Sequence, residues 1–207
     1  MQKNYLSQLY KSDQTVFTLQ EAAMIWGEPD SEKVKKRLYR YKKEGKLYSP
    51  RRGIYTKDKD YAEYELATKI YTPAYISLET VLASSGLIFQ FYSQIFVISY
   101  LTREITVDEQ TYNFRKIKDT ILTNKKGVKK LDNYWVASTE RAFLDTIYLN
   151  KKYYFDNLSP LDWDKVFKLL DVYEDHDWVK EKTKEYYQEF NQDQAQHKQV
   201  NKHNTKN

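Results

Sequence analysis

With 207 residues, of which 41% are hydrophobic, the chain is long enough for one large domain or two small ones with packed cores. It contains no cysteine, which excludes a disulfide framework, thiolate metal sites and a cysteine nucleophile, and its net charge of +5 arises from one segment, residues 31–57. The N-terminus has no apolar stretch typical of a signal peptide, and the most apolar run, residues 86–101, is interrupted by polar residues. We therefore expect a cytoplasmic protein without a membrane-spanning segment.

Two helices are predicted before residue 30. Residues 2–12 place Tyr5 and Leu9 at helical spacing. Thr18 and Glu21 have the spacing of a capping box, which predicts the start of a second helix. The sequence GEPD at residues 27–30 then breaks this helix and forms a turn.

A third helix is predicted over residues 31–44. Ser31 is expected to cap its start, and Gly45 has the position of a glycine that ends a helix. Val34, Leu38 and Tyr41 recur at i, i+4 and i+7, which predicts one apolar stripe along the helix.

Two short strands, residues 47–49 and 54–56, are predicted to follow, joined by the turn PRRG at residues 50–53. Three helices and a hairpin within 57 residues have the order of a winged helix-turn-helix. We therefore predict a DNA-binding domain of this kind at residues 1–57.

Positive charge is concentrated in the third helix and the hairpin. Residues 31–57 contain eleven lysines and arginines but two glutamates, a net charge of +9, so the remainder of the chain has a net charge of −4. Cations gathered in this way favour binding to duplex DNA. The residues predicted to bind DNA are Ser31, Lys33, Lys36, Arg37, Arg40, Lys43, Arg51 and Arg52.

These residues are expected to play different parts. Arg37 and Arg40 are predicted to contact guanine edges, because a guanidinium matches the O6 and N7 acceptors, whereas the lysines hold phosphates. Arg51 and Arg52, at the predicted hairpin tip, are expected to reach the DNA backbone or the minor groove. The first turn of the helix is expected to enter the major groove first.

A domain with a small sheet is predicted over residues 58–190. Acidic residues 58 and 60 begin a helix that ends before Pro73, and a short helix runs from Ser77 to Gly86. Period-two alternation and buried apolar runs predict the strands that follow. They are residues 95–101, 105–107, 112–114, 128–131 and 134–137.

Three further helices are predicted after the strands. Ser138 or Thr139 caps the first, Ser159 with Pro160 starts the second, and Asp177 starts the third.

The last residues, 191–207, are mainly Asn, Gln, Lys and His, and we expect a disordered polar tail. The predicted fold class is α+β. An N-terminal winged helix-turn-helix is followed by a mixed α/β C-terminal domain with a small sheet and several helices.

Three sequence blocks, in this order, resemble a known family. They are RGIY at residues 52–55, AYISLETVL at residues 74–82 and VASTERAFLD at residues 136–145. Together they are similar to the AbiEi-type antitoxins of abortive-infection systems, over roughly residues 15–150.

The resemblance implies a transcriptional autorepressor that binds its own operon promoter, at inverted repeats. It also implies a type IV antitoxin, which counteracts a nucleotidyltransferase-like toxin without a stable complex. The resemblance further implies that Ser138, Glu140, Arg141 and Asp145 take part in the antitoxin function. From the residues alone, Ser138 or Thr139 caps a helix and Arg141 pairs with Asp145 at i, i+4.

The sequence supports an enzyme less well than it supports a DNA-binding protein. Histidine occurs only at positions 176, 197 and 203, which argues against a histidine triad or a histidine-rich metal site. We expect no enzymatic activity, no cofactor and no metal. Two alternatives stay open. One is a Mg²⁺-dependent nuclease using Glu140, Asp145, Asp162 and Asp164, and the other is an adaptor that binds a partner protein tightly.

Overall fold

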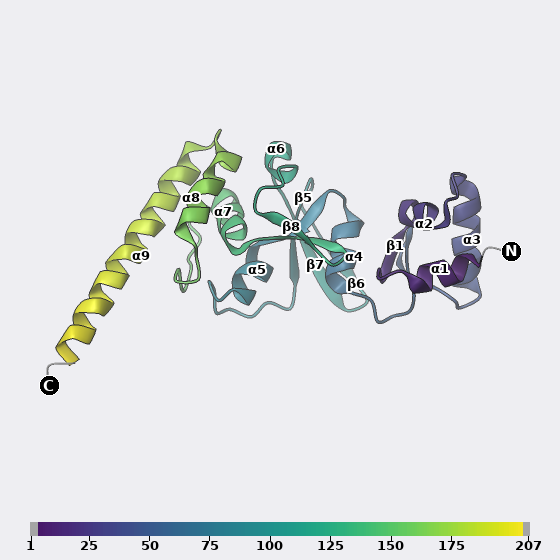
Figure 1. The fold of residues 1–207 in the computed structure, drawn as a ribbon, viewed down its shortest axis with the longest axis horizontal. Helices are drawn as coiled ribbons and strands as arrows, with labels where there is room; N and C mark the ends of the chain where they lie inside the picture. The colour runs from purple at the N-terminus through teal and green to yellow at the C-terminus, as the bar shows by residue number, and fades with distance from the viewer. Residues whose placement is uncertain (1–3, 205–207) are drawn as a thin grey trace. The chain divides into compact units, whose positions relative to one another are not determined.

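The structure, a computed structural model, describes the backbone of residues 4–204 and the side chains of residues 4–195. It is a mixed α+β protein with two β-sheets, which confirms the α+β part of the predicted fold class (Figure 1). The chain divides into two compact units. The first comprises residues up to Ile76, Ser93–Lys116 and Lys130–Trp135, and the second comprises Ser77–Tyr92, Ile117–Lys129 and the residues from Val136 onward.

Three helices open the first unit: α1 (Tyr5–Lys11), α2 (Leu19–Trp26) and α3 (Ser31–Lys43). The predicted capping box is present at the start of α2, because Thr18 accepts a hydrogen bond from the Glu21 backbone and Glu21 accepts one in return. The N-cap of α3 is Asp30 and not Ser31, because the Asp30 carboxylate accepts hydrogen bonds from the backbone N–H groups of Glu32 and Lys33. Gly45, with φ of 68°, follows the end of α3 as predicted.

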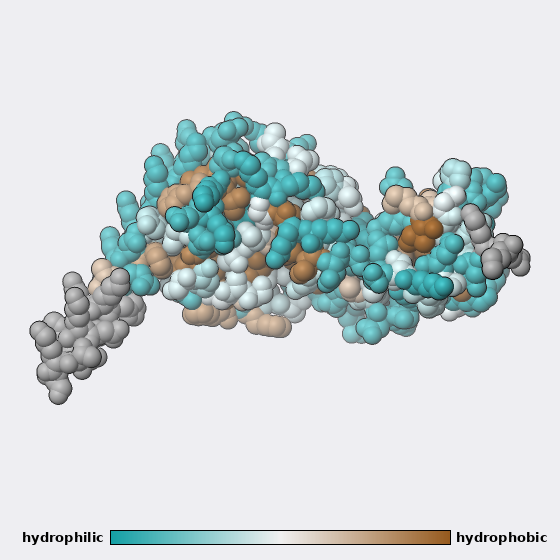
Figure 2. Space-filling model, in the orientation of Figure 1, coloured by the Kyte–Doolittle hydropathy of each residue, from teal (hydrophilic) through white to brown (hydrophobic). Residues whose placement is uncertain are grey.

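A small antiparallel sheet completes this part, with strands β1 (Val16–Thr18), β2 (Tyr48–Arg51) and β3 (Ile54–Thr56) in the order β1-β3-β2. The helices and the sheet share one core around Trp26, Leu38 and Tyr55. Figure 2 shows hydrophilic residues over the visible face of α3 and a small hydrophobic area over α2. Helix α3 therefore buries one side only.

The second sheet has six strands, in the order β6-β7-β5-β4-β9-β8. The predicted hairpin is present as an antiparallel pair, and β5 is buried along its whole length, as its apolar run indicated. Strand β5 pairs with β7 in parallel. The strands are β4 (Ala74–Ile76), β5 (Ile95–Ser99), β6 (Arg103–Val107), β7 (Gln110–Lys116), β8 (Val128–Leu131) and β9 (Tyr134–Ala137).

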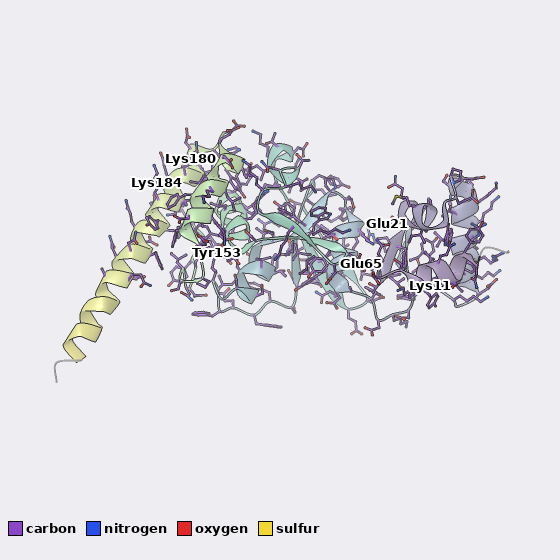
Figure 3. All side chains as sticks on the ribbon, in the orientation of Figure 1. Lys11, Glu21, Glu65, Tyr153, Lys180 and Lys184 are labelled. Carbon is purple, nitrogen blue, oxygen red and sulfur yellow. The ribbon has the colours of Figure 1, made fainter. Side chains whose placement is uncertain are left out.

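Helix α4 (Glu63–Ile70) is joined to the segment before β1 and to α2 by a polar network. The Glu65 carboxylate accepts hydrogen bonds from the backbone and hydroxyl of Thr15, at 2.9 and 2.7 Å. Lys69 lies 2.7 Å from Glu65 and 2.9 Å from Glu21, both labelled in Figure 3. Because of such contacts, residues 1–57 share a compact unit with the strands that follow, whereas the sequence placed a boundary at residue 57.

The second unit is mainly helical: α5 (Leu78–Ser84), α6 (Asp119–Leu122), α7 (Thr139–Leu149), α8 (Trp163–Leu169), the 3₁₀ helix η1 (Leu170–Tyr173) and α9 (Asp177–Asn204). Ser138 caps α7, as predicted, by accepting a hydrogen bond from the Arg141 backbone N–H. Helix α8 begins three residues later than predicted from Pro160, because Asp162 supplies its cap. Asp177 starts α9, also as predicted.

The polar tail differs from its prediction. Helix α9 continues through it to Asn204, while residues 205–207 lie outside the described part of the chain. The sequence has no glycine or proline after Pro160, and Gln, Lys and Ala are good helix formers, so nothing ends the helix once it has started. None of the helices within residues 4–204 combines the length and the apolar character that a bilayer crossing requires.

Candidate nucleic-acid interface

Helix α3 presents lysines on the side opposite to its buried stripe. Val34 and Leu38 are fully buried and Tyr41 is nearly so, as their spacing predicted. At about 3.6 residues per turn, Lys36 and Lys43 project from the other side of the helix, and both are exposed. The apolar stripe thus fixes the helix, and the lysines face solvent.

Arg37 does not lie where it was predicted. Its guanidinium stacks on the Tyr5 ring, 3.6 Å from the ring centre, and lies 5.3 Å from the centre of the Trp26 ring. Position 37 follows Val34 by three residues and precedes Tyr41 by four, so it borders the buried stripe. Arg37 therefore belongs to the margin of the core and is poorly placed to reach a guanine edge.

The other predicted residues of α3 are exposed and weakly paired. Lys33 Nζ is 3.5 Å from Asp30, and Arg40 Nε is 3.7 Å from Glu44. Exposed pairs of this kind contribute about 0–1 kcal/mol, so a phosphate can replace the carboxylate. Ser31 is the first residue of the helix, and its side chain is exposed.

The two carboxylates beside these cations, Asp30 and Glu44, have lowered pKa values. A hydrogen bond from the backbone N–H of Lys33 holds the pKa of Asp30 below its usual value. A hydrogen bond from the Lys46 side chain lowers the pKa of Glu44 in the same way. Both side chains therefore stay ionised at neutral pH, one at each end of α3.

The two arginines of the hairpin have different surroundings. Arg51 is half-buried, because its guanidinium donates a hydrogen bond of 3.1 Å to the Tyr71 hydroxyl and lies 5.6 Å from the centre of that ring. Arg52 is exposed at the turn, next to Gly53, whose φ of 83° favours glycine. Of the predicted pair, only Arg52 is at the tip and available to a ligand.

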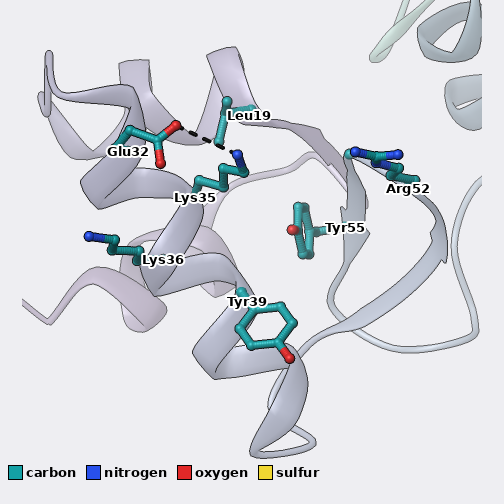
Figure 4. Close-up of a pocket in the computed structure, with 8 residues that line it drawn as sticks. Leu19, Glu32, Lys35, Lys36, Tyr39, Arg52 and Tyr55 are labelled. Carbon is teal, nitrogen blue, oxygen red and sulfur yellow. Dashed lines mark ion pairs between the residues drawn. The ribbon is translucent and has the colours of Figure 1, made fainter.

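A groove of about 370 Å³ runs between α3 and the hairpin (Figure 4). The rings of Tyr39 and Tyr55 line it together with Leu19. The cationic side chains of Lys35, Lys36 and Arg52 also line the groove, beside these apolar groups. Glu32 pairs with Lys35 at 3.6 Å, and both side chains are exposed. The lining residues are Leu19, Glu32, Lys35, Lys36, Tyr39, Arg52, Gly53 and Tyr55.

Six of the lining residues were not among those predicted, and three of these six lie on α3: Glu32, Lys35 and Tyr39. Helical geometry was enough to find them. Each projects within about a third of a turn of the direction opposite to the apolar stripe, and the stripe was recognised from the sequence.

Within the part of the chain that the structure describes, Lys36, Lys43 and Arg52 have no acidic partner. Their charges are thus uncompensated by the protein. Such cations on a helix face and on the adjacent turn are suited to an anion that carries several negative charges.

The block at residues 136–145 has a different place, in the core of the second unit. Arg141 and Asp145 are fully buried, and Arg141 Nε lies 3.1 Å from Asp145, the predicted i, i+4 pair. Asp145 also accepts hydrogen bonds from Ser77 at 2.9 Å and from Tyr173 at 2.6 Å. Ser77 thereby joins the block at residues 74–82 to the block at residues 136–145.

This burial bears on the predicted antitoxin residues. Arg141 donates three hydrogen bonds to the backbone carbonyls of Ile121, Asn124 and Lys126. Glu140 is 7% exposed, and the Ser138 hydroxyl caps α7. The structure gives Arg141 and Asp145 a role in holding α7, α6 and α5 together, with no surface for a partner.

Two of the four carboxylates considered for a nuclease, Asp145 and Asp162, are engaged elsewhere. Asp145 is buried, and Asp162 caps α8 and pairs with Lys165 at 3.0 Å. Residues 4–195 contain no group of three or more His, Asp or Glu side chains arranged to hold a metal ion. A search of protein-family models and of curated proteins finds no match to this chain.

Proposed function

We propose that residues up to Thr56 form a winged helix-turn-helix that binds duplex DNA through α3 and the turn at Arg52. One observation carries this proposal: Lys36, Lys43 and Arg52 are exposed and lack acidic partners in the described part of the chain. Side chains that could have been neutralised by the protein's 29 acidic residues are instead left for a polyanion.

The shape of the surface favours a duplex over other polyanions. An α-helix with its side chains is about 10–12 Å wide, and the major groove of B-DNA is about 12 Å wide. A hairpin turn beside such a helix lies where the flanking backbone passes. Lys36 and Lys43 are then phosphate contacts of the helix, and Arg52 is a contact of the turn.

The resemblance of the chain to AbiEi-type antitoxins extends the proposal to a biological role. We infer a repressor of its own promoter, acting at inverted repeats in the cytoplasm, and an antitoxin towards a nucleotidyltransferase-like toxin. Two of the three blocks that carry the resemblance, residues 74–82 and 136–145, meet at the hydrogen bond between Ser77 and Asp145. This hydrogen bond joins both blocks in one buried core. In our proposal, the surface that acts on the toxin pathway lies outside this buried cluster.

A salt titration with duplex DNA tests the DNA-binding proposal. Each phosphate contact contributes about −0.9 to the slope of log affinity against log salt, so Lys36→Ala with Arg52→Ala reduces the slope by about 1.8. Lys129→Ala with Lys130→Ala is the matched control, because it removes two exposed lysines from β8. Fluorescence anisotropy of labelled duplex provides the measurement.

The control variant is expected to bind with the slope of the wild type. Equal slopes for all three proteins would remove α3 and the turn from the interface. The antitoxin role is tested separately by co-expression with a nucleotidyltransferase-like toxin. Rescue of growth by a chain that carries the Lys36 and Arg52 substitutions is expected, and failure of the wild type to rescue would refute this role.

A further inference from the structure

Tyr39 stands out on the proposed DNA-binding surface because it is large, aromatic and exposed. Its side chain is 63% exposed at the middle of α3, although the chain buries many of its other aromatic residues. No group among the described residues hydrogen-bonds its hydroxyl. The ring is therefore free to contact a ligand.

The ring is surrounded by cations. Lys35 and Lys36 precede it by four and three residues, and Lys43 follows it by four, so all three project beside it on the helix. On its other side, Tyr39 lines the groove with Leu19 and Tyr55 (Figure 4). An apolar strip thus lies among charged side chains, of which Lys35, Lys36 and Arg52 are basic and Glu32 is acidic.

The major groove of DNA offers few apolar groups to such a strip. Among the base edges there, the C5-methyl group of thymine is the apolar one, and the other groups are hydrogen-bond donors and acceptors. A ring on the outward side of a helix in that groove meets base edges, whereas the cations beside it meet phosphates.

Resting on the proposed function, we propose that Tyr39 is a specificity-determining residue that reads thymine through its methyl group. The ring packs against the methyl, and the lysines beside it set the register on the backbone. Lys36, Lys43 and Arg52 supply affinity for any duplex, and Tyr39 adds preference for a thymine at one or two positions.

The test begins with selection of preferred duplexes from a random-sequence pool by the wild-type chain. Each thymine of the selected duplex is then replaced by deoxyuridine, which removes the methyl group and keeps the base pair. Loss of one buried methyl corresponds to about a fourfold loss of affinity at the position that Tyr39 reads. Tyr39→Ala is expected to bind the thymine and deoxyuridine duplexes equally.

Two variants separate the ring from its neighbours. Tyr39→Phe keeps the ring, so it is expected to keep the fourfold preference for thymine. Lys36→Ala is expected to weaken binding to both duplexes by the same factor, because a phosphate contact carries no base information. Circular dichroism of each variant establishes that α3 is intact.

Three outcomes would overturn the inference. Tyr39→Ala could keep the wild-type preference for thymine over deoxyuridine, or the wild type could lack such a preference at every position. Tyr39→Ala could also weaken binding to the single strand alone, which would assign the ring to base stacking. If the wild type binds no duplex, the proposed function itself fails, and the two failures are thereby distinguished.

Discussion

The guanidinium of Arg37, 3.6 Å from the centre of the Tyr5 ring, has the geometry of a cation–π interaction. Arg37→Ala removes this contact and the packing of the side-chain stem, and we expect a loss of about 1–2 kcal/mol in the free energy of unfolding. Urea denaturation of the full chain measures it. Arg37→Met, which keeps an apolar stem, is expected to lose less than half of that amount.

A contrary result is easily recognised. If Arg37→Ala unfolds at the wild-type urea concentration but loses its base preference, then Arg37 contacts DNA, as the sequence first indicated.

The two arginines predicted to read guanine differ in one respect that decides their roles. Arg40 projects away from the apolar stripe, whereas Arg37 borders it.

The buried pair of Arg141 and Asp145 gives a second prediction at the level of single residues. Asp145→Ala leaves the fully buried Arg141 without its carboxylate, and this costs about 3–5 kcal/mol of unfolding free energy. Glu185→Ala breaks an exposed pair with Lys182 and is expected to change stability by less than about 1 kcal/mol. Equal effects of the two substitutions in urea denaturation would show that the buried pair is not structural.

Among the elements, α3 carries an acidic residue on its DNA-facing side. Glu32 lies in the groove and pairs with Lys35 at 3.6 Å. Glu32→Gln removes a charge that repels phosphate and frees Lys35, so we expect affinity for duplex DNA to rise severalfold at low salt. Anisotropy titrations measure it, with Glu109→Gln on the turn after β6 as a control. A fall in affinity would mean that Glu32 accepts a hydrogen bond from a base.

The carboxylate of Glu21, at the start of α2, is expected to make the stability of the fold depend on pH. Burial raises the pKa of Glu21, but hydrogen bonds from Lys69 and from Thr18 outweigh this effect and hold the pKa below its usual value of 4.5. The carboxylate therefore stabilises the fold above pH 4.5, and the contribution is lost as the pH falls through the lowered pKa. Glu21→Gln is expected to be less stable than the wild type at pH 7, with a difference that shrinks towards pH 3. A difference that stays constant across this range would contradict the assignment.

Local signals in the sequence predicted most elements of this chain. The capping box at Thr18, the glycine after α3 and the alternation of residues 103–116 each have a physical cause that acts over a few residues. The caps at Asp30 and Asp162 were misplaced by one to three residues, because serine and aspartate are nearly equal in preference and the chain has both.

At the scale of the whole molecule, contacts between distant residues decided what the sequence left open. Arg51 is held by Tyr71, twenty residues away, and Asp108 accepts hydrogen bonds from Tyr48 and Tyr61, at 2.7 and 2.8 Å. No local pattern marks such partners. The position of a side chain on its helix was predictable, but its availability to DNA depended on these contacts.

Charge is also organised at this scale. The segment of residues 31–57 has a net charge of +9 and the remainder has −4, so a strongly basic region lies within a chain whose other residues are mildly acidic. Such an asymmetry attracts a polyanion towards one surface and speeds association at low salt. Binding that took place elsewhere on the molecule would have to oppose this field.

Site-directed photo-crosslinking tests the central claim most directly, because the chain has no cysteine of its own. Single substitutions Lys36→Cys, Lys43→Cys, Arg52→Cys, Lys130→Cys and Lys184→Cys each accept an aryl-azide label. The account predicts crosslinks to duplex DNA from positions 36, 43 and 52, and none above background from positions 130 and 184. Crosslinks from positions 130 or 184 in place of those from α3 and the hairpin would contradict it.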